Sequence, residues 1–317
     1  MRRPQLPARV MRAGVRALVR PVLHPRFPLA VQRRWLELVT APTPLPADVD
    51  VRPGDLGGRP AEVLTARGAD GTRTLLYLHG GGFTVGSPAT HRALAAHLAA
   101  AAGATVHLLD YRLAPEHPFP AAADDAVAAW RQLVERGADP ARAAIVGDSA
   151  GGWLALTAAL RLRDAGDRLP AVLGLISPWL DLTGASWPAE VTDPMLQPAW
   201  LHACAGAFGA GADVGGPAFA PLRGDLAGLP PMVVQVGSEE ILLPDAVALA
   251  RAARAAGVPV DLRRLDGLWH VAHASAGLVA ESTAAVGAFG SALAARLSPP
   301  SPPAPSPGRG RRRASAR

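Results

Sequence analysis

The feature that most restricts the fold of this sequence is a six-residue turn motif that directly follows an apolar run. Residues 147–152 read Gly-Asp-Ser-Ala-Gly-Gly, and residues 143–146 before them read Ala-Ala-Ile-Val. The pattern Gly-x-Ser-x-Gly is typical of a sharp turn from a strand into a helix, which lifts the serine hydroxyl to the end of a sheet. Because the pattern also occurs by chance, Ser149 needs a second, independent signal before it can be interpreted as a nucleophile.

A glycine-rich loop earlier in the chain supplies that signal. Residues 79–83 read His-Gly-Gly-Gly-Phe and again follow a short apolar run. Glycines let the backbone approach an acyl carbon closely, so that N–H groups can face a developing oxyanion. We expect Gly81 and Gly82 to donate from this loop and Ala150 to donate from the start of the helix after the nucleophile. His79 is expected to brace the loop by a hydrogen bond.

Two histidines downstream of Ser149 are candidates for the base that activates it. A serine hydroxyl is a poor nucleophile until a base removes its proton, and an acid has to orient that base. The order along the chain that accompanies this turn motif is serine, acid, histidine. His270 lies in a loop just after an apolar run and is our predicted base, whereas His273 is more typical of a helix surface or pocket wall. A third downstream histidine, His202, falls in an irregular segment.

Three carboxylates follow the predicted strand at residues 232–236 and are candidates for the acid. They are Glu239, Glu240 and Asp245. Acidic residues near a helix start are also favoured by the helix dipole and often act as caps, and Asp245 directly after Pro244 fits that role. We predict Glu240 as the catalytic acid.

Short apolar runs alternate with longer Ala/Leu-rich stretches along the middle of the chain. This alternation predicts an α/β fold, a mostly parallel central sheet with helices on both faces. The expected edge strands are 49–52 and 61–65, and the expected buried strands are 74–78, 105–110, 143–146, 172–176, 232–236 and 260–265. The expected helices include 90–102, 121–136, 151–165 and 244–256.

Three segments lie outside the alternation. Residues 1–45 carry apolar residues and arginines at helical spacing, which predicts a helical cap broken near Pro21 and Pro25. An insertion at about residues 183–228 is rich in Pro, Gly, Trp and Ala, and we expect it to join the cap over the carboxyl ends of the strands. Residues 298–317 are rich in Pro and then Arg and are predicted to form a disordered tail, which leaves 46–297 as the catalytic domain.

The composition excludes several other classes of protein. Among 317 residues the one cysteine, Cys204, cannot form an internal disulfide, and we expect a packed, inert thiol and a cytoplasmic location. No apolar run is long enough to span a membrane. The net charge of +6 comes from arginine alone and is concentrated at the two ends of the chain. We expect no specific nucleic-acid binding; the alternative is electrostatic attachment of the arginine-rich tails to nucleic acid or an anionic membrane, which is compatible with catalysis. The chain has no phosphate-loop motif and no His-Glu-x-x-His pattern, so a metal site is not expected.

Several segments together resemble a known family. Residues 110–122, between the two glycine motifs, read Asp-Tyr-Arg-Leu-Ala-Pro-Glu-His-Pro-Phe-Pro-Ala-Ala. With residues 228–231, 237–243 and 269–271, they resemble the hormone-sensitive lipase family of the α/β-hydrolase superfamily, which includes the bacterial family IV carboxylesterases. The resemblance covers nearly all of residues 45–295 and implies an α/β-hydrolase fold with a helical cap.

The resemblance also assigns roles to the candidate residues. It implies that the nucleophile is Ser149, the acid Glu240 and the base His270, with Gly81, Gly82 and Ala150 as oxyanion donors. The sequence departs from the family pattern at three positions. Glu240 stands where the family commonly has Asp, Pro244 replaces a polar residue, and Trp153 stands where Asn is frequent and is expected to pack within its helix.

The implied activity is hydrolysis of carboxylic esters. The resemblance implies a serine carboxylesterase for short to medium acyl esters that works through an acyl-enzyme, with a small-molecule ester as its partner and with no cofactor or metal. It implies no oligomeric state. The alternative is a non-catalytic small-molecule-binding protein on the same fold, as in a plant hormone receptor that lacks the triad histidine. The presence of serine, acid and histidine in the expected order favours the enzyme.

Overall fold

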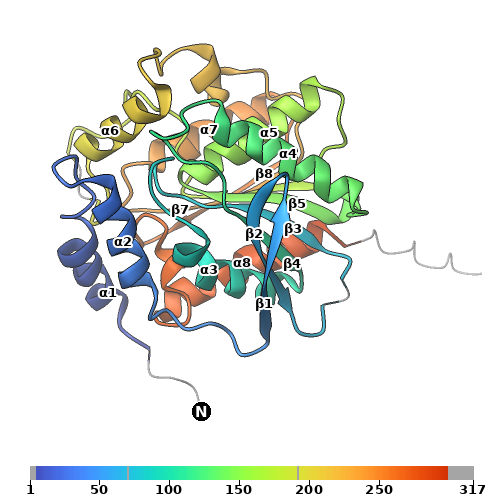
Figure 1. Cartoon of the computed structure of the whole chain (residues 1–317), viewed down its shortest axis with the longest axis horizontal. Helices are drawn as coiled ribbons and strands as arrows, with labels where there is room; N and C mark the ends of the chain where they lie inside the picture. Colours follow the sequence, from blue (N-terminus) through green and yellow to red (C-terminus); the bar gives the residue numbers. More distant parts are fainter. Residues whose placement is uncertain (1–4, 70, 191–192, 299–317) are drawn as a thin grey trace, which may run out of the picture.

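An eight-stranded sheet organises the part of the chain that the computed structural model describes, residues 5–69, 71–190 and 193–298 (Figure 1). Its order is β1-β2-β4-β3-β5-β6-β7-β8. The pairs β1–β2 and β2–β4 are antiparallel, and the pairs β4–β3, β3–β5, β5–β6, β6–β7 and β7–β8 are parallel. The strands are β1 Val49–Leu56, β2 Arg59–Ala66, β3 Thr74–Leu78, β4 Thr105–Leu109, β5 Ala143–Asp148, β6 Val172–Ile176, β7 Met232–Gly237 and β8 Val260–Leu265.

The central strands β5, β6 and β7 are buried along their whole length, as expected for parallel strands covered on both faces. Two of the predicted positions in the sheet are wrong. Strand β2 was expected at an edge, but a Gly57-Gly58 hairpin turn folds β1 back onto it, and β1 takes the edge instead. Strand β8 was expected to be buried, but it ends the sheet, and its charged residues Arg263 and Arg264 face solvent.

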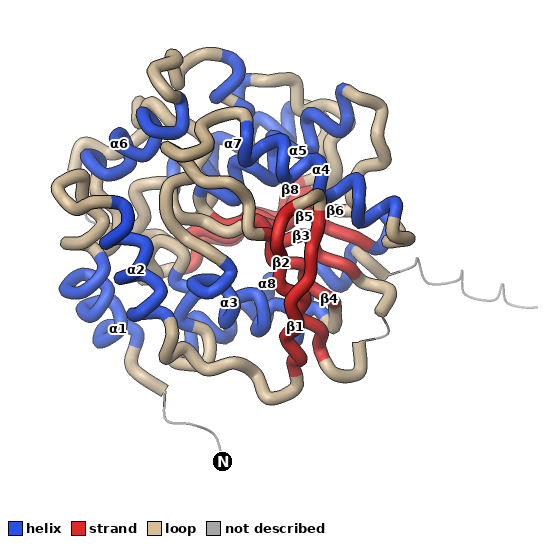
Figure 2. The backbone as a smooth tube through the Cα atoms, viewed as in Figure 1, coloured by secondary structure: helices blue, strands red, loops and turns tan. Residues whose placement is uncertain are grey.

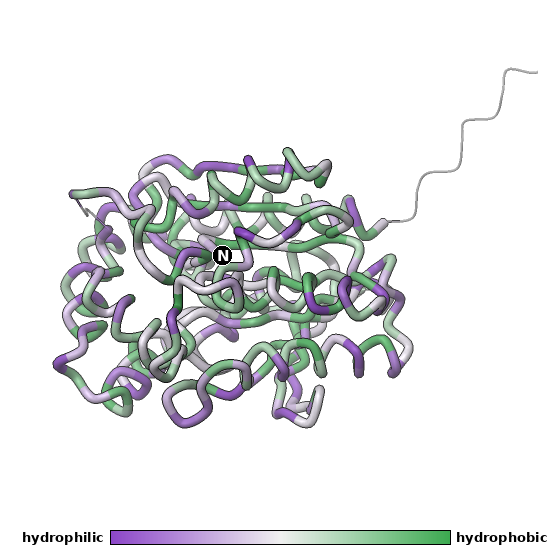
Figure 3. The backbone as a smooth tube through the Cα atoms, turned by 90° about the horizontal axis from the view of Figure 1, so that it is seen from above, coloured by the Kyte–Doolittle hydropathy of each residue, from purple (hydrophilic) through white to green (hydrophobic). Residues whose placement is uncertain are grey.

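Helices cover both faces of the sheet (Figure 2). Side chains of α3 and α8 pack in one core cluster, and those of α4, α5 and α7 pack in another. Figure 3 shows predominantly apolar strands between helices that mix apolar and polar residues, as expected for helices with one buried face. These helices are α3 Pro88–Ala102, α4 Ala121–Glu135, α5 Ala150–Asp164, α7 Leu243–Ala255 and α8 Ala280–Arg296, and the short helical turns are η2 Pro140–Arg142, η3 Pro217–Phe219, η4 Pro221–Arg223 and η5 Ala272–Ser275.

The two segments expected at the cap both contain helices where they are described, although most of the 183–228 insertion is irregular. The N-terminal segment forms α1 Ala8–Gly14, the π-helical turn η1 Val15–Val19 and α2 Leu29–Thr40, with the predicted break falling in the proline-containing stretch 20–28. The 183–228 insertion contributes α6 Pro198–Gly209. Figure 1 shows α1, α2 and α6 on the same side of the molecule. Residues 299–317 of the predicted tail lie outside the described residues.

Candidate active site

Ser149 occupies a strained turn between β5 and α5. Its backbone has φ 53° and ψ −119°, a region that residues with a side chain rarely adopt, and its N–H donates to the carbonyl of Ile176 at 2.9 Å. The flanking glycines allow the turn because a Cβ on Gly147 would overlap the carbonyl of Gly151, and one on Gly151 would overlap the carbonyl of Leu78. Close packing of the turn against the sheet therefore fixes the serine at the carboxyl ends of the strands.

The glycine loop after β3 lies against this turn. Gly81 has φ 116° and Gly82 has φ 59°, and the loop is closed by hydrogen bonds from Thr84 and Val85 to the carbonyl of Gly81. Within the described residues, the N–H groups of Gly81, Gly82 and Ala150 donate to no other protein group. These backbone donors are therefore free to bind an anion, and the Ala150 donor lies at the positive end of α5.

A buried carboxylate joins the glycine loop to the serine turn. Asp148 Oδ1 accepts hydrogen bonds from Tyr77 Oη at 2.8 Å and from the Gly80 N–H at 3.0 Å, while its Oδ2 lies 3.4 Å from His91 Nε2. Burial raises the pKa of Asp148, but the charge and hydrogen bond of His91 and the hydrogen bond of Tyr77 outweigh burial and hold the pKa below its ordinary value. The ionised carboxylate thus holds Gly80, the residue before Gly81 and Gly82.

Sequence reasoning did not assign a role to Asp148 or His91. His91 precedes Ser149 in the chain, outside the order serine, acid, histidine, yet α3 brings it to the wall of the cavity described below. A usable signal was present for Asp148, because a carboxylate directly before the nucleophile has to be buried at the end of a central strand. A buried carboxylate needs partners, which in this chain come from β3 and α3.

His79 braces the glycine loop, as expected. Its Nδ1 lies 2.7 Å from the carbonyl of Gly80, and its ring stacks on Tyr111 with ring centroids 4.2 Å apart. A carbonyl can only accept, so Nδ1 carries the proton. Burial, together with the nearby His91, lowers the pKa of His79 to about 3, which keeps the ring neutral near pH 7.

The three candidate acids point in different directions. Glu240 Oε2 lies 3.0 Å from His270 Nδ1. Glu239 instead forms an ion pair with Arg12 of α1 at 2.6 Å. Asp245 lies in the first turn of α7, but its carboxylate accepts hydrogen bonds from the N–H groups of residues 180 and 181 and from Ser186.

Glu240 is held on both oxygens. Its Oε1 accepts hydrogen bonds from Ser177 Oγ at 2.7 Å and from the Gly237 N–H, which leaves Oε2 for His270. Sequence reasoning did not identify Ser177, although it directly follows β6 at the end of the sheet where the site lies. Its backbone has φ 47° and its hydroxyl also accepts from the Val271 N–H at 3.3 Å, so Ser177 connects Glu240 with the loop that carries His270.

The charge of His270 is set by two opposing effects. Burial lowers its pKa, but the hydrogen bond and charge of Glu240 outweigh burial and raise the pKa above the ordinary histidine value. His273 is different. Its Nε2 lies 2.8 Å from Gln235 Oε1, burial lowers its pKa to about 4, and it is not among the residues that line the cavity.

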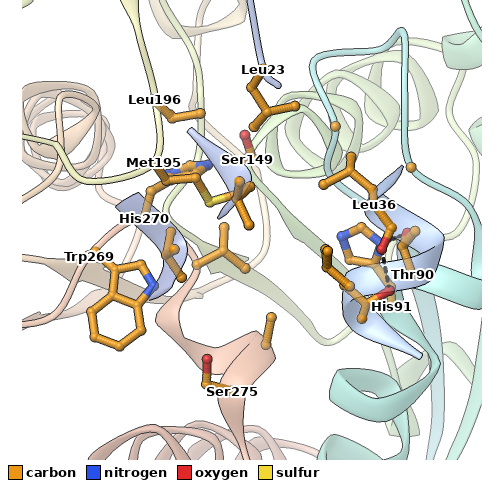
Figure 4. A pocket seen from close by; sticks show the side chains of 18 of the residues that line it. Leu23, Leu36, Thr90, His91, Ser149, Met195, Leu196, Trp269, His270 and Ser275 are labelled. Carbon is orange, nitrogen blue, oxygen red and sulfur yellow. Dashed lines mark hydrogen bonds between the residues drawn. The ribbon is translucent and has the colours of Figure 1, made fainter. Parts of the chain in front are cut away.

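Ser149 and His270 face a common cavity of about 250 Å³ (Figure 4). The strand ends and their loops contribute Gly81, Asp148 and Trp269 to its lining, and α3 contributes His91. The 183–228 insertion contributes Met195, Leu196 and Trp200. The aliphatic side chains that the N-terminal helices and the 20–28 stretch contribute are Met11, Val15, Leu18, Val19, Leu23, Leu36 and Val39.

Two residues from the sequence analysis pack behind the site. Trp153 is fully buried, donates from Nε1 to the carbonyl of Phe219 at 3.0 Å and does not line the cavity, so its expected packing role is confirmed. Cys204 packs against Gly82, where an added Cβ would lie 2.9 Å from the sulfur. Burial raises the pKa of the Cys204 thiol to about 12, which agrees with an inert thiol. In residues 5–69, 71–190 and 193–298 there is no cluster of His, Cys, Asp and Glu that could hold a metal ion.

Known proteins share this fold and much of this sequence. A family model described as the alpha/beta hydrolase fold matches residues 75–274. An acetyl-hydrolase of Streptomyces hygroscopicus is 48% identical over 71% of this chain and 77% of its own length, and an esterase of Acinetobacter venetianus is 38% identical over 70% and 74%. The crystal structure of an esterase from the bacterial hormone-sensitive lipase family is 40% identical, covers 90% of this chain and 98% of its own, and has a TM-score of 0.86. The chain belongs to the hormone-sensitive lipase family.

Two departures from the pattern of the hormone-sensitive lipase family have a structural counterpart in this chain. The longer Glu240 side chain is accommodated because Ser177 and Gly237 hold one of its oxygens while the other reaches His270. Pro244 lies in the first turn of α7, where the missing N–H costs no helical hydrogen bond.

Proposed function

We propose that the protein hydrolyses esters of short to medium acyl chains with Ser149 as nucleophile, His270 as general base and Glu240 as the acid that orients it. The observation that carries this proposal is the buried Glu240–His270 pair, whose histidine lines the same cavity as a serine held in a strained turn. The chain itself is a hydrolase of the carboxylic-ester class, because the similar proteins reported above are named esterases or an acetyl-hydrolase.

In the acylation step, His270 Nε2 takes the proton of Ser149 Oγ as the oxygen bonds to the ester carbonyl carbon. Glu240 stays ionised, accepts the Nδ1 proton in a hydrogen bond and stabilises the imidazolium that forms. The raised pKa of His270 has the same origin, since the carboxylate favours the protonated ring. The imidazolium then gives its proton to the leaving alcohol, and an acyl-enzyme on Ser149 remains.

The negative charge that develops on the carbonyl oxygen is assigned to the backbone N–H groups of Gly81, Gly82 and Ala150. Support comes from their freedom from other protein partners within the described residues. Donors that are already aimed at the oxyanion need no reorganisation during the reaction. In the second half of the reaction, His270 takes a proton from a water molecule as the water oxygen attacks the carbonyl carbon of the acyl-enzyme. The carboxylic acid product leaves, and His270 returns the proton to Ser149 Oγ.

The substrate class is inferred from the cavity. Its lining from the N-terminal helices is aliphatic, and its volume of about 250 Å³ has room for a short to medium alkyl chain. Burial of methylene groups supplies the binding free energy for such a chain. We assign both residues 1–45 and the 183–228 insertion to a cap over the site, because both segments contribute side chains to the cavity.

The test compares the wild type with Ser149→Ala on p-nitrophenyl acetate and butyrate. We expect a loss of about 10³-fold or more with an unchanged circular dichroism spectrum, because the acyl-enzyme cannot form. Equal turnover of the two proteins would overturn the proposal. A fluorophosphonate probe should label the wild type and not Ser149→Ala, whereas the non-catalytic binding protein considered above would stay unlabelled.

A further inference from the structure

The exposed large apolar side chains of the described residues are concentrated in one part of the molecule. Apart from Val247 on α7, all of them lie within residues 6–45. They are Leu6, Val10, Leu18, Val31, Leu38 and Leu45. Single exposed apolar residues are normal on a protein surface, but such a concentration marks an interaction surface.

The same segment is strongly basic. Residues 1–36 contain no Asp or Glu, and the arginines within the described part of this stretch are Arg9, Arg12, Arg16, Arg20, Arg26, Arg33 and Arg34. Arg12 and Arg33 are used in ion pairs with the body of the protein. Arg9 and Arg16 are exposed, lie on one side of the α1–η1 helix two turns apart, and form no ion pair within the described residues.

The exposed apolar and basic side chains lie on neighbouring helices. Trp35 Nε1 of α2 donates to the carbonyl of Leu18 in η1 at 2.7 Å, so the two helices are joined (Figure 1). On α2, Val31, Arg34 and Leu38 are exposed and spaced three and four residues apart, which places them on one face. This outer face of the N-terminal helices, residues 6–45, therefore combines aliphatic side chains with guanidinium groups.

The outer face adjoins the entrance of the cavity. Leu18 is 55% exposed and also lines the cavity that contains Ser149. Partly exposed residues Met11 and Val39 on the same helices line it as well. A molecule that leaves an apolar phase in contact with this face has a short apolar path to the serine.

We propose that the outer face of the N-terminal helices docks on the surface of a bilayer that contains anionic phospholipid. Aliphatic side chains insert at the boundary of the headgroups, and Arg9 and Arg16 contact lipid phosphates. Helices in the described parts of the chain are all too short or too polar to span a bilayer, so the contact is interfacial. On the proposed function, the docked protein takes apolar esters directly from the membrane.

The charge pattern favours a bilayer over a second copy of this chain as the partner. An isologous dimer through this face would bring two sets of unpaired arginines together, because the first acidic residue of the segment is Glu37. An anionic lipid surface instead supplies the opposite charge to Arg9 and Arg16, whereas Arg12, Arg33 and Arg34 already have carboxylate partners. A purely zwitterionic bilayer supplies much less negative charge to Arg9 and Arg16.

The experiment measures co-sedimentation of the full chain carrying Ser149→Ala, so that binding is scored without hydrolysis. Vesicles of phosphatidylcholine that contain about 30% of the anionic lipid phosphatidylglycerol should bind the protein. Vesicles of phosphatidylcholine alone should not. Val31→Asp with Leu38→Asp should lower the partition coefficient by about tenfold or more, and Arg9→Glu with Arg16→Glu should do the same. The matched controls on α7, Val247→Asp and Arg251→Glu, should bind as before.

Three outcomes would overturn this inference. In the first, the two double variants of the N-terminal helices bind vesicles as well as the α7 controls do. In the second, binding is lost only on deletion of residues 299–317, which would assign vesicle binding to that segment. Light scattering could instead show a dimer that Val31→Asp with Leu38→Asp dissociates, so that a second copy covers the face. Hydrolysis of soluble p-nitrophenyl butyrate by the active forms of these variants is expected to stay unchanged, which separates a failure of docking from a failure of the proposed function.

Discussion

Helix α5, which begins directly after Ser149, buries eleven of its fifteen residues, whereas α1 and η1 bury none of theirs. The floor of the site, formed by the glycine loop, the serine turn and the loops that carry Glu240 and His270, is set by backbone packed against backbone. The N-terminal helices, by contrast, are held mainly by side-chain contacts such as Arg12 with Glu239 and Gln32 with Trp200. We therefore expect the floor to tolerate little change and, on the proposed function, the cover to vary and to select substrates.

The largest expected effect is on the chemistry of the floor. Glu240→Ala should lower kcat for p-nitrophenyl butyrate by about 10³- to 10⁴-fold, because His270 loses the partner that orients it and stabilises its charge. Asp245→Asn is the matched control. It keeps an acceptor for the residue 180–181 N–H groups and should change kcat by only a few fold, so the reverse pattern would transfer the acid role to Asp245.

Alanine substitutions at two glycines, one in each region, test whether the floor is more sensitive to an added side chain than the N-terminal helices are. Gly151→Ala should lower the free energy of unfolding by about 3 kcal/mol or more, because its Cβ would overlap the backbone of Leu78. Gly14→Ala in α1 should be neutral or raise it by up to about 1 kcal/mol, since the residue is helical and no atom lies within 4 Å of the added Cβ. Urea unfolding at pH 7 measures both, and similar losses at the two positions would contradict the distinction.

Buried histidines of the floor predict a loss of stability in acid. Burial lowers the pKa of His79 to about 3 and that of His273 to about 4, so both stay neutral in the folded protein at pH 5 while the unfolded chain is protonated. Stability is therefore highest above the unfolded histidine pKa and falls as the pH drops below about 6.5, by roughly 2 kcal/mol for each histidine at pH 5.

Asp245 opposes this trend in part. Burial raises its pKa to about 6, so it contributes stability that grows as the pH falls through that value. Urea titrations between pH 7 and pH 5 should show the net loss, and His273→Gln should flatten the profile because its replacement does not titrate. An equally steep profile in that variant would exclude His273 as a source of the effect.

The smallest effect is expected in the cover. Val15→Trp should fill part of the cavity and lower kcat/KM for p-nitrophenyl octanoate by about tenfold relative to p-nitrophenyl acetate, because the indole would occupy space that the longer acyl chain needs. Ala17→Trp, on an exposed position of the same helix outside the cavity lining, is the control and should leave the ratio unchanged. An unchanged ratio in Val15→Trp would show that the N-terminal helices do not select the acyl chain.

Much of the fold could be predicted because its signals are local. The buried runs at residues 143–146, 172–176 and 232–236 lie within strands of the structure, and Ala150 begins the predicted helix after the serine. Positions within the sheet were harder to predict. The periodicity of residues 61–65 and 260–265 does not show which strand has a neighbour on both sides. For this reason the predictions of β2 as an edge strand and of β8 as a buried strand are both wrong.

The sequence alone determined the parts of the site that depend on backbone conformation over a few residues. The Gly-x-Ser-x-Gly turn at Ser149 and the glycines at 80–82 follow from sterics that act within one segment, and these are readable from residue types. The tertiary structure decided which of three neighbouring carboxylates meets His270, that Asp148 holds the glycine loop with Tyr77 and His91, and which helices wall the cavity. Those contacts join segments far apart in the chain, so they depend on strand order and side-chain direction, which no local pattern records.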